Sequence, residues 1–254
     1  VWIVLLLLQR LFAGYGLRKY LSLPLFIVFS GLDAIGSRMQ GTLALRPSSL
    51  VQGGHIEWWA KRYQFSSNTT LLHWVPQHAI PSWIGGLLVI HIVRSRQNLF
   101  LLPVIALFAM LWSPFAAVGI VVIALLLLIG TGLASEFLNN LRKFPLLVIS
   151  LLVIGIPVLV FLQFGTSDIP NSLLLSQGSF THNIKMLIQF IPLEFGMVAG
   201  MTGILLRHKI RENLIVSLGL TLVLMVVVGM YNDFAMRVSP ALLVVILVNA
   251  CDAL

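Results

Sequence analysis

The sequence predicts an all-α, polytopic transmembrane helical bundle of about eight or nine membrane segments, with a long non-cytoplasmic loop that carries amphipathic helices. The chain is 59% hydrophobic and only 9% charged, and its mean hydropathy is +1.01. Apolar stretches of about 15 to 23 residues recur between short polar breaks. Backbone groups in such stretches must be hydrogen-bonded internally, which favours helices, and the alternating pattern of a membrane β-barrel is absent.

Apolar segments follow one another along the chain, and we expect 1–254 to form a single transmembrane domain. They cover about 1–8, 20–32, 82–93, 98–112, 115–130, 145–163, 184–206, 214–230 and 240–254. Because the chain begins without Met and inside an apolar run, we expect a fragment of a longer protein. Proline interrupts the helical hydrogen-bond ladder, so Ser113-Pro114 predicts a tight hairpin between two segments, with one long kinked helix as the alternative.

The basic residues predict the orientation of these segments. Four short loops carry most of them, namely Arg10, Arg18 and Lys19, then Arg94 and Arg96, then Arg142 and Lys143, then Arg207, Lys209 and Arg211. Lysine and arginine are enriched in cytoplasmic loops, so all four loops are placed in the cytoplasm. Because the net charge of +8 lies mostly in these clusters beside apolar segments, we exclude nucleic acid as a partner and expect membrane lipids instead.

Most ionisable residues suited to chemistry fall on the opposite, outer face. They are Asp33, Glu57, Asp168, Asp233, His55, His73, His78 and His182. Glu136 and Glu212 are placed in the cytoplasm, and Glu194 lies inside an apolar segment. This asymmetry predicts a functional site at the non-cytoplasmic surface.

A polar, aromatic-rich loop at 31–81 is the main candidate for that site, because it gathers acids, bases and amides between membrane segments. It begins with Gly31-Leu32-Asp33. An aspartate at the membrane boundary is costly to desolvate, so Asp33 is a candidate general base or cation ligand. The alternative is a helix C-terminal turn in which Gly31 and Gly36 allow the bend and Asp33 is solvated.

The rest of the loop offers candidate substrate-binding residues, namely His55, Glu57, Tyr63, Asn68 and Gln77. The spacing around Trp58-Trp59 also fits one face of an interfacial helix, in which the two tryptophans act as membrane anchors. The run from Tyr63 to Thr70 is rich in hydrogen-bonding groups. Such groups suit a polyhydroxylated or phosphate ligand, or form a plain polar loop.

Candidates for proton transfer and phosphate binding lie near two later membrane segments. His78 stands between Pro76 and Pro81, which restrict the backbone, and imidazole exchanges protons near neutral pH. His78 therefore joins Asp33 as a candidate catalytic residue, with a simple turn as the alternative. Asp233 and Arg237 are spaced to pair on one helical face, and an arginine can instead clamp a phosphate, so both are candidate substrate-binding residues.

Gly31-Leu32-Asp33 after a membrane helix, the long loop and the many short membrane helices that follow resemble the GT-C class of membrane glycosyltransferases. The stretches 63–83 and 232–240 also look like parts of bacterial membrane proteins of this type. The resemblance implies a polyprenyl-phosphate-linked sugar as donor and a periplasmic active site at the bacterial inner (plasma) membrane. It also implies Asp33 as base, with His78 or Arg237 as phosphate ligands. Some of these enzymes carry paired acids that are missing next to Asp33, so no cofactor is implied and a divalent cation stays open.

We therefore expect a glycosyl-transfer enzyme in which Asp33 deprotonates an acceptor hydroxyl while His78 and Arg237 stabilise the departing lipid phosphate. The first alternative is a transporter or lipid-linked-saccharide flippase that uses Glu194, because acids inside membrane segments are functional candidates. The second is a non-enzymatic scaffold that binds a partner through the Trp-rich loop.

Overall fold

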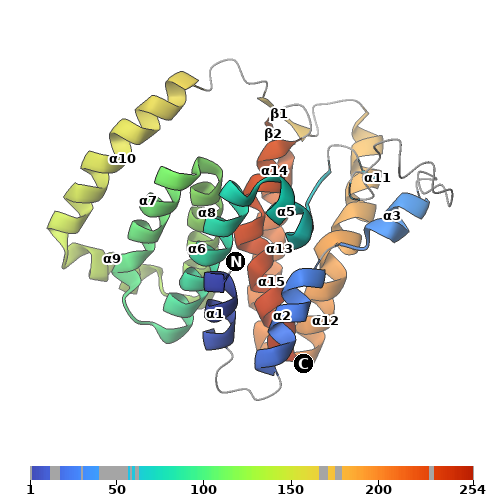
Figure 1. The fold of residues 1–254 in the computed structure, drawn as a ribbon, viewed down its shortest axis with the longest axis horizontal. Helices are drawn as coiled ribbons and strands as arrows, with labels where there is room; N and C mark the ends of the chain where they lie inside the picture. Colours follow the sequence, from blue (N-terminus) through green and yellow to red (C-terminus); the bar gives the residue numbers. More distant parts are fainter. Residues whose placement is uncertain are drawn as a thin grey trace.

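The computed structural model describes residues 2–11, 18–29, 31–39, 57, 59–60, 63–165, 171–174, 179–228 and 232–253, and these are mostly helical (Figure 1). The α-helices are α1 (Trp2–Leu11), α2 (Arg18–Val28), α3 (Asp33–Met39), α5 (Asn68–Trp74), α6 (Pro76–Ser95), α7 (Leu102–Trp112), α8 (Pro114–Thr131), α9 (Ala134–Arg142), α10 (Pro145–Gly165), α11 (Phe180–Ile191), α12 (Met197–Leu205), α13 (Ile210–Met225), α14 (Asp233–Val238) and α15 (Pro240–Ala253). The remaining elements are the 3-10 turns η2 (Leu99–Leu101) and η5 (Arg207–Lys209), the π-helical turn η4 (Pro192–Gly196), and strands β1 (Asn171–Leu173) and β2 (Val226–Val228). The predicted all-α class is confirmed.

Helices α6, α8, α13 and α15 pack against one another at the centre of the molecule (Figure 1). Within α15, every residue from 240 to 249 is buried. A helix that is apolar all round is expected to be enclosed by others, because it has no polar face to offer to water. The apolar run that begins at 240 therefore forms a core helix of this bundle, α15.

The bundle has two ends with different polar groups. At one end, His78 in the first turn of α6 bonds Ser113 at the start of α8. At the other, Arg94 in the last turn of α6 pairs with Glu212 of α13 and Asp252 of α15. We call these the His78 end and the Arg94 end. The basic clusters at 94–96 and 207–211 thus share one end, as their predicted placement on one side of the membrane requires.

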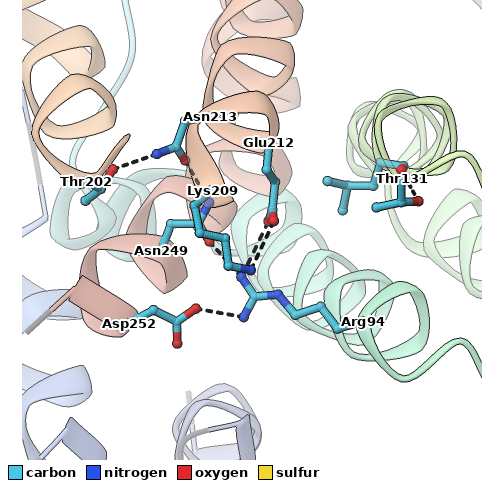
Figure 2. A network of polar contacts seen from close by, with 9 residues as sticks. Arg94, Thr131, Thr202, Lys209, Glu212, Asn213, Asn249 and Asp252 are labelled. Atoms are coloured by element: carbon cyan, nitrogen blue, oxygen red, sulfur yellow. Dashed lines mark hydrogen bonds and ion pairs between the residues drawn. The ribbon is translucent and has the colours of Figure 1, made fainter. Parts of the chain in front are cut away.

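A polar network ties four helices together at the Arg94 end (Figure 2). Arg94 donates to Asn249 Oδ1 of α15 at 2.7 Å, and Asn249 Nδ2 donates to Asn213 Oδ1 of α13 at 2.7 Å. Asn213 Nδ2 then donates to Thr202 Oγ1 of α12 at 2.7 Å. Because both asparagines are buried, these bonds satisfy amide groups that would otherwise destabilise the bundle.

The predicted number of membrane-spanning helices is wrong for the described residues. Among the described residues, two helices are long and apolar enough to cross a membrane, Pro114–Thr131 and Phe180–Leu205, or three if the bent pair α9–α10 is one span. Other apolar runs form helices that are too short, such as α2 and α7 with 11 residues each and α15 with 14. A bilayer core needs about 20 residues of helix, so the described residues hold two or three helices of that kind and not the expected eight or nine.

The predicted hairpin at Ser113-Pro114 is confirmed. Helix α7 ends at Trp112, Ser113 is extended with φ −151° and ψ 112°, and Pro114 opens α8. The Ser113 side chain accepts a hydrogen bond from the Ala116 N–H at 3.2 Å, which caps α8. The two helices pack against each other, so the alternative of one long kinked helix is wrong.

The segment 214–230 is not helical to its end. After α13, residues 226–228 form β2, which pairs antiparallel with β1 and places Val227 opposite Ser172. Three consecutive valines favour an extended backbone, because a branched β-carbon loses rotamer freedom in a helix. The small sheet joins the predicted outer loop 164–183 to the end of α13.

The described parts of the loop 31–81 contain α3 and α5, and the loop is shorter than predicted because α6 begins at Pro76. Proline suits the first turn of a helix, where its missing N–H would have no partner. Gln77 and His78 therefore belong to α6. His55, Trp58 and Asp168 lie outside the described residues.

Candidate functional site

A buried carboxyl pair joins Asp33 to Glu194, far along the chain. Asp33 begins α3 and is 6% exposed, and Glu194 in η4 is 5% exposed. The Leu32 N–H donates to the Leu193 carbonyl at 2.8 Å, which ties the start of α3 to η4. The two side chains are close enough to share a hydrogen bond. Such a bond needs a proton on one carboxyl, so the pair can hold an acid beside a base.

The π-helical turn η4 determines where Glu194 lies. Pro192, the first residue of η4, has no N–H and interrupts the helical ladder between α11 and α12. The Met197 N–H donates instead to the Pro192 carbonyl, five residues back. Wide turns of this kind are rare and are found frequently at functional sites. Here the turn lies in the middle of the candidate span Phe180–Leu205 and carries its acid.

Two glycines leave room for the side chains around this pair. A β-carbon on Gly31 would overlap the Glu194 carboxyl, and one on Gly36 would overlap the Trp59 ring. Neither glycine has a positive φ. Their role is therefore close approach, and the alternative in which they serve only to bend the chain around a solvated Asp33 is wrong.

Trp59 covers the carboxyl pair from the loop, and Glu57 lies close enough for its charge to act on Glu194. Trp59 is buried, and its indole Nε1–H donates to Glu194 Oε1 at 3.4 Å. The interfacial-anchor alternative is therefore wrong for Trp59. Glu57 Oε1 accepts from the Ser67 N–H at 3.3 Å and from Thr70 Oγ1 at 2.8 Å. Its second oxygen, Oε2, is buried without a hydrogen-bond partner among the described residues.

The run that follows Trp59 turns its polar groups inward. The Tyr63 hydroxyl donates to the carbonyl and side-chain oxygens of Asn183, each at 3.1 Å, and burial raises the pKa of Tyr63. Asn68 Nδ2 donates to the Phe26 carbonyl at 2.9 Å. Tyr63 also packs on Phe190, at 5.9 Å between ring centroids. The candidate ligands Tyr63 and Asn68 are thus engaged with the protein in this structure.

A second cluster lies around His78. Its Nδ1 is 2.7 Å from Ser113 Oγ, and its ring meets the Phe115 ring edge-on at 5.5 Å between centroids. Burial, and next the positive charge of Arg237, lower the pKa of His78 to about 4. Because its pKa is this low, His78 is neutral at neutral pH and can donate or accept a hydrogen bond. Its helix α6 is not one of the two helices that are long and apolar enough to cross a membrane.

Arg237 completes this second cluster. It pairs with Asp233 at 3.2 Å, as the spacing predicts, and its guanidinium lies 5.2 Å from the centre of the Phe115 ring. Arg237 Nε is buried without a hydrogen-bond partner within the described part of the chain. An arginine that still has a donor to satisfy is suited to an anionic group.

An apolar groove leads toward this cluster along the half of α6 and α7 that is nearer the His78 end. Its volume is about 210 Å³, and its walls are Pro81, Ile84, Gly85, Leu88, Val104, Ile105, Phe108, Ala109 and Trp112. Trp112 directly precedes Ser113, the partner of His78, and Pro81 is one turn beyond His78. The apolar groove therefore ends beside a polar cluster that contains a cation.

The predicted catalytic residues Asp33 and His78 fall into different groups. His78 and Arg237 come together, whereas Asp33 lies with Glu194, and Asp33 is not among the charges that act on His78. Gln77 is exposed. Sequence reasoning did not pair Asp33 with Glu194, although a proline and an acid inside one apolar run were a signal for an irregular helix there.

Within the part of the chain that the structure describes, no group of three or more His, Cys, Asp or Glu side chains is arranged to hold a metal ion. No family model, curated protein or solved structure matches this sequence. The two clusters, the groove and the resemblance of the Asp33 region are the observations that bear on function.

Proposed function

We propose that this chain belongs to a bacterial inner-membrane glycosyltransferase that transfers a sugar from a polyprenyl-phosphate carrier to an acceptor hydroxyl, at the non-cytoplasmic face. The observation that carries the proposal is the buried Asp33–Glu194 pair, since glycosyl transfer to a hydroxyl needs a base at the acceptor. The resemblance of Gly31-Leu32-Asp33 and the following loop to GT-C enzymes supports it.

In this mechanism Asp33 is the base. It takes the proton of the acceptor hydroxyl while the acceptor oxygen bonds to the anomeric carbon. The bond from that carbon to the carrier phosphate breaks, and its electron pair leaves with the phosphate. Glu194 is a positioning residue that holds the Asp33 carboxyl, and Trp59 covers the pair and limits water.

The second cluster supports a binding place for the carrier. The groove between α6 and α7 is apolar and suits a hydrocarbon chain. Arg237, at the polar end of the groove, supplies a positive charge for the phosphate, and neutral His78 supplies a hydrogen bond. The sugar then has to extend from this cluster to Asp33.

Substitution of Asp33 by Asn tests the proposal. Asn keeps the size of the side chain and removes the base, so transfer of radiolabelled sugar from polyprenyl phosphate should fall by about 10²-fold or more. His182→Gln, at an exposed position on α11, is the matched control and should retain activity. A folded Asp33→Asn protein with undiminished transfer excludes Asp33 as the base.

A transporter or flippase of lipid-linked saccharides is the second candidate. It is favoured by the position of Glu194, a buried acid at a π-helical turn in the middle of a candidate span. Reconstituted liposomes separate the two functions. Movement of a lipid-linked saccharide without chemical turnover, lost in Glu194→Gln, supports the transporter, whereas turnover that requires Asp33 supports the enzyme.

A further inference from the structure

Helices α9 and α10 form an elbow at the Arg94 end. Their axes differ by 95° across the break at 143–144. Helix α10 is apolar, with Leu146 78% exposed and Val153 66% exposed, and it stands away from the bundle (Figure 1). Exposed apolar surface of this extent is stable in lipid and unstable in water. If α10 runs across the membrane, the elbow places α9 parallel to the membrane plane.

The side chains of α9 fit that position. Phe137 packs against the core, Leu138 is 53% exposed, and Glu136 and Asn139 lie on the other side of the helix. No residue of α9 is buried. A short helix with one apolar and one polar side is the kind that lies in the interface between headgroups and acyl chains.

Two cations occupy the bend of the elbow. Arg142 ends α9, Lys143 follows it, and both are exposed. Phe144 stacks on Phe100 at 4.4 Å between ring centroids, which fixes the bend against η2. The bend therefore holds two positive charges where an in-plane helix turns into the membrane, at the depth of lipid phosphates.

The surrounding charges favour an anionic partner. Glu212 and Asp252, the acids at this end of the bundle, are already paired with Arg94, and the described Glu136 of α9 forms no ion pair with either cation. Neither Arg142 nor Lys143 takes part in an ion pair among the described residues. An anion at the bend would therefore meet two cations that have no competing carboxylate partner.

We propose that α9 is an interfacial helix and that Arg142 and Lys143 at its end bind the phosphate headgroups of anionic membrane lipids. This site lies at the Arg94 end and is independent of the proposed transfer chemistry at the His78 end. Each basic residue near an anionic surface strengthens binding several-fold, so the pair gives selectivity of about tenfold or more for anionic over zwitterionic lipid.

The test uses the full chain in uncharged detergent micelles titrated with phosphatidylglycerol or phosphatidylcholine. Lipid binding by the wild-type protein should be half-saturated at a phosphatidylglycerol concentration about tenfold lower than the phosphatidylcholine concentration that gives the same binding. The double variant Arg142→Gln/Lys143→Gln should lose this difference. Arg207→Gln/Arg211→Gln removes equal charge from exposed residues at the same end and should keep it. Equal loss in both variants, or no preference in wild type, overturns the proposal.

A second measurement does not depend on how well the charge variants fold. An environment-sensitive fluorophore on Leu138→Cys should be quenched by brominated acyl chains in phosphatidylglycerol vesicles, because Leu138 faces the lipid. The same fluorophore on Glu136→Cys, on the polar side of α9, should be quenched several-fold less. Equal quenching at the two positions shows that α9 does not lie in the interface, and overturns the proposal.

Discussion

Close approach of side chains to the backbone decides the geometry around Asp33. The Glu194 carboxyl occupies the space where a β-carbon of residue 31 would lie, and the Trp59 ring does the same at residue 36. Any side chain at these positions must displace a group of the carboxyl pair or its cover. The sequence Gly31-Leu32-Asp33-Ala34-Ile35-Gly36 is thus matched to residues elsewhere in the chain.

Gly31→Ala should destabilise the protein by about 1–3 kcal/mol, because the added methyl group overlaps the Glu194 carboxyl in a packed region. The control is Gly200→Ala in α12, where a β-carbon would meet nothing within 4 Å. That change should be neutral or stabilising by up to about 1 kcal/mol, since alanine favours helix. Thermal unfolding in detergent measures both. Equal midpoints for the two variants would contradict the close approach.

His78 makes the stability depend on pH. Its pKa falls from 6.5 in an ordinary environment to about 4 in the folded protein, through burial and Arg237. Between these values the unfolded chain binds more protons than the native state. The stability from neutral His78 is therefore complete above about pH 6.5 and is lost as the pH falls toward 4.

His78→Gln removes this titration and should flatten the fall of the unfolding midpoint between pH 7 and pH 4.5. The control His182→Gln, at an exposed position, should follow the wild-type curve. If His78→Gln and wild type lose stability in parallel, the titration of His78 is not responsible.

At the scale of helices, the asparagine network at the Arg94 end holds α6, α12, α13 and α15 in register. Asn213→Leu should lower stability by about 2–4 kcal/mol, because it leaves the buried Asn249 Nδ2 without its acceptor and removes the bond to Thr202 Oγ1. Arg211→Gln, at an exposed position two residues away in α13, should change stability by less than about 0.5 kcal/mol.

The double variant Asn213→Leu/Asn249→Leu separates lost bonds from general disruption. Removing both amides leaves fewer unsatisfied groups than removing one, so the two substitutions should be less destabilising together than the sum of their single effects. Strict additivity in thermal unfolding would argue against a coupled network.

At the scale of the whole molecule, α6 connects the two ends. Gln77 in its first turn and Arg96 just after its last residue are both exposed. Helix α6 packs along the candidate span α8, and the 19 residues between these positions rise about 30 Å, the thickness of a bilayer core. We expect a membrane-impermeant maleimide to label Gln77→Cys in intact cells, and Arg96→Cys only after permeabilisation. Wild type, whose single Cys251 is buried, is the unlabelled control. Labelling of both sites from one side would show that the His78 end and the Arg94 end do not lie on opposite sides of the membrane.

The predicted elements that depend on local chemistry agree with the structure. The helical class, the Ser113-Pro114 hairpin and the Asp233–Arg237 pair all follow from residues that are close in sequence. The count of membrane spans does not agree, because composition marks apolar runs without showing where a helix ends. The valines at the end of 214–230 are such a case, since they extend into β2 and pair with β1.

The sequence by itself determined that the chain is apolar and mostly helical, and which residues carry charge. Tertiary structure alone decided that Asp33 meets Glu194, that Trp59 is buried over them, and that His78 joins Arg237 in another place. Patterns of hydropathy and spacing predict structure over a few neighbouring residues, whereas Asp33 and Glu194 are 161 positions apart. Contacts across such distances depend on how helices pack, and a glycine, a π-helical turn and an indole N–H brought these carboxyls together.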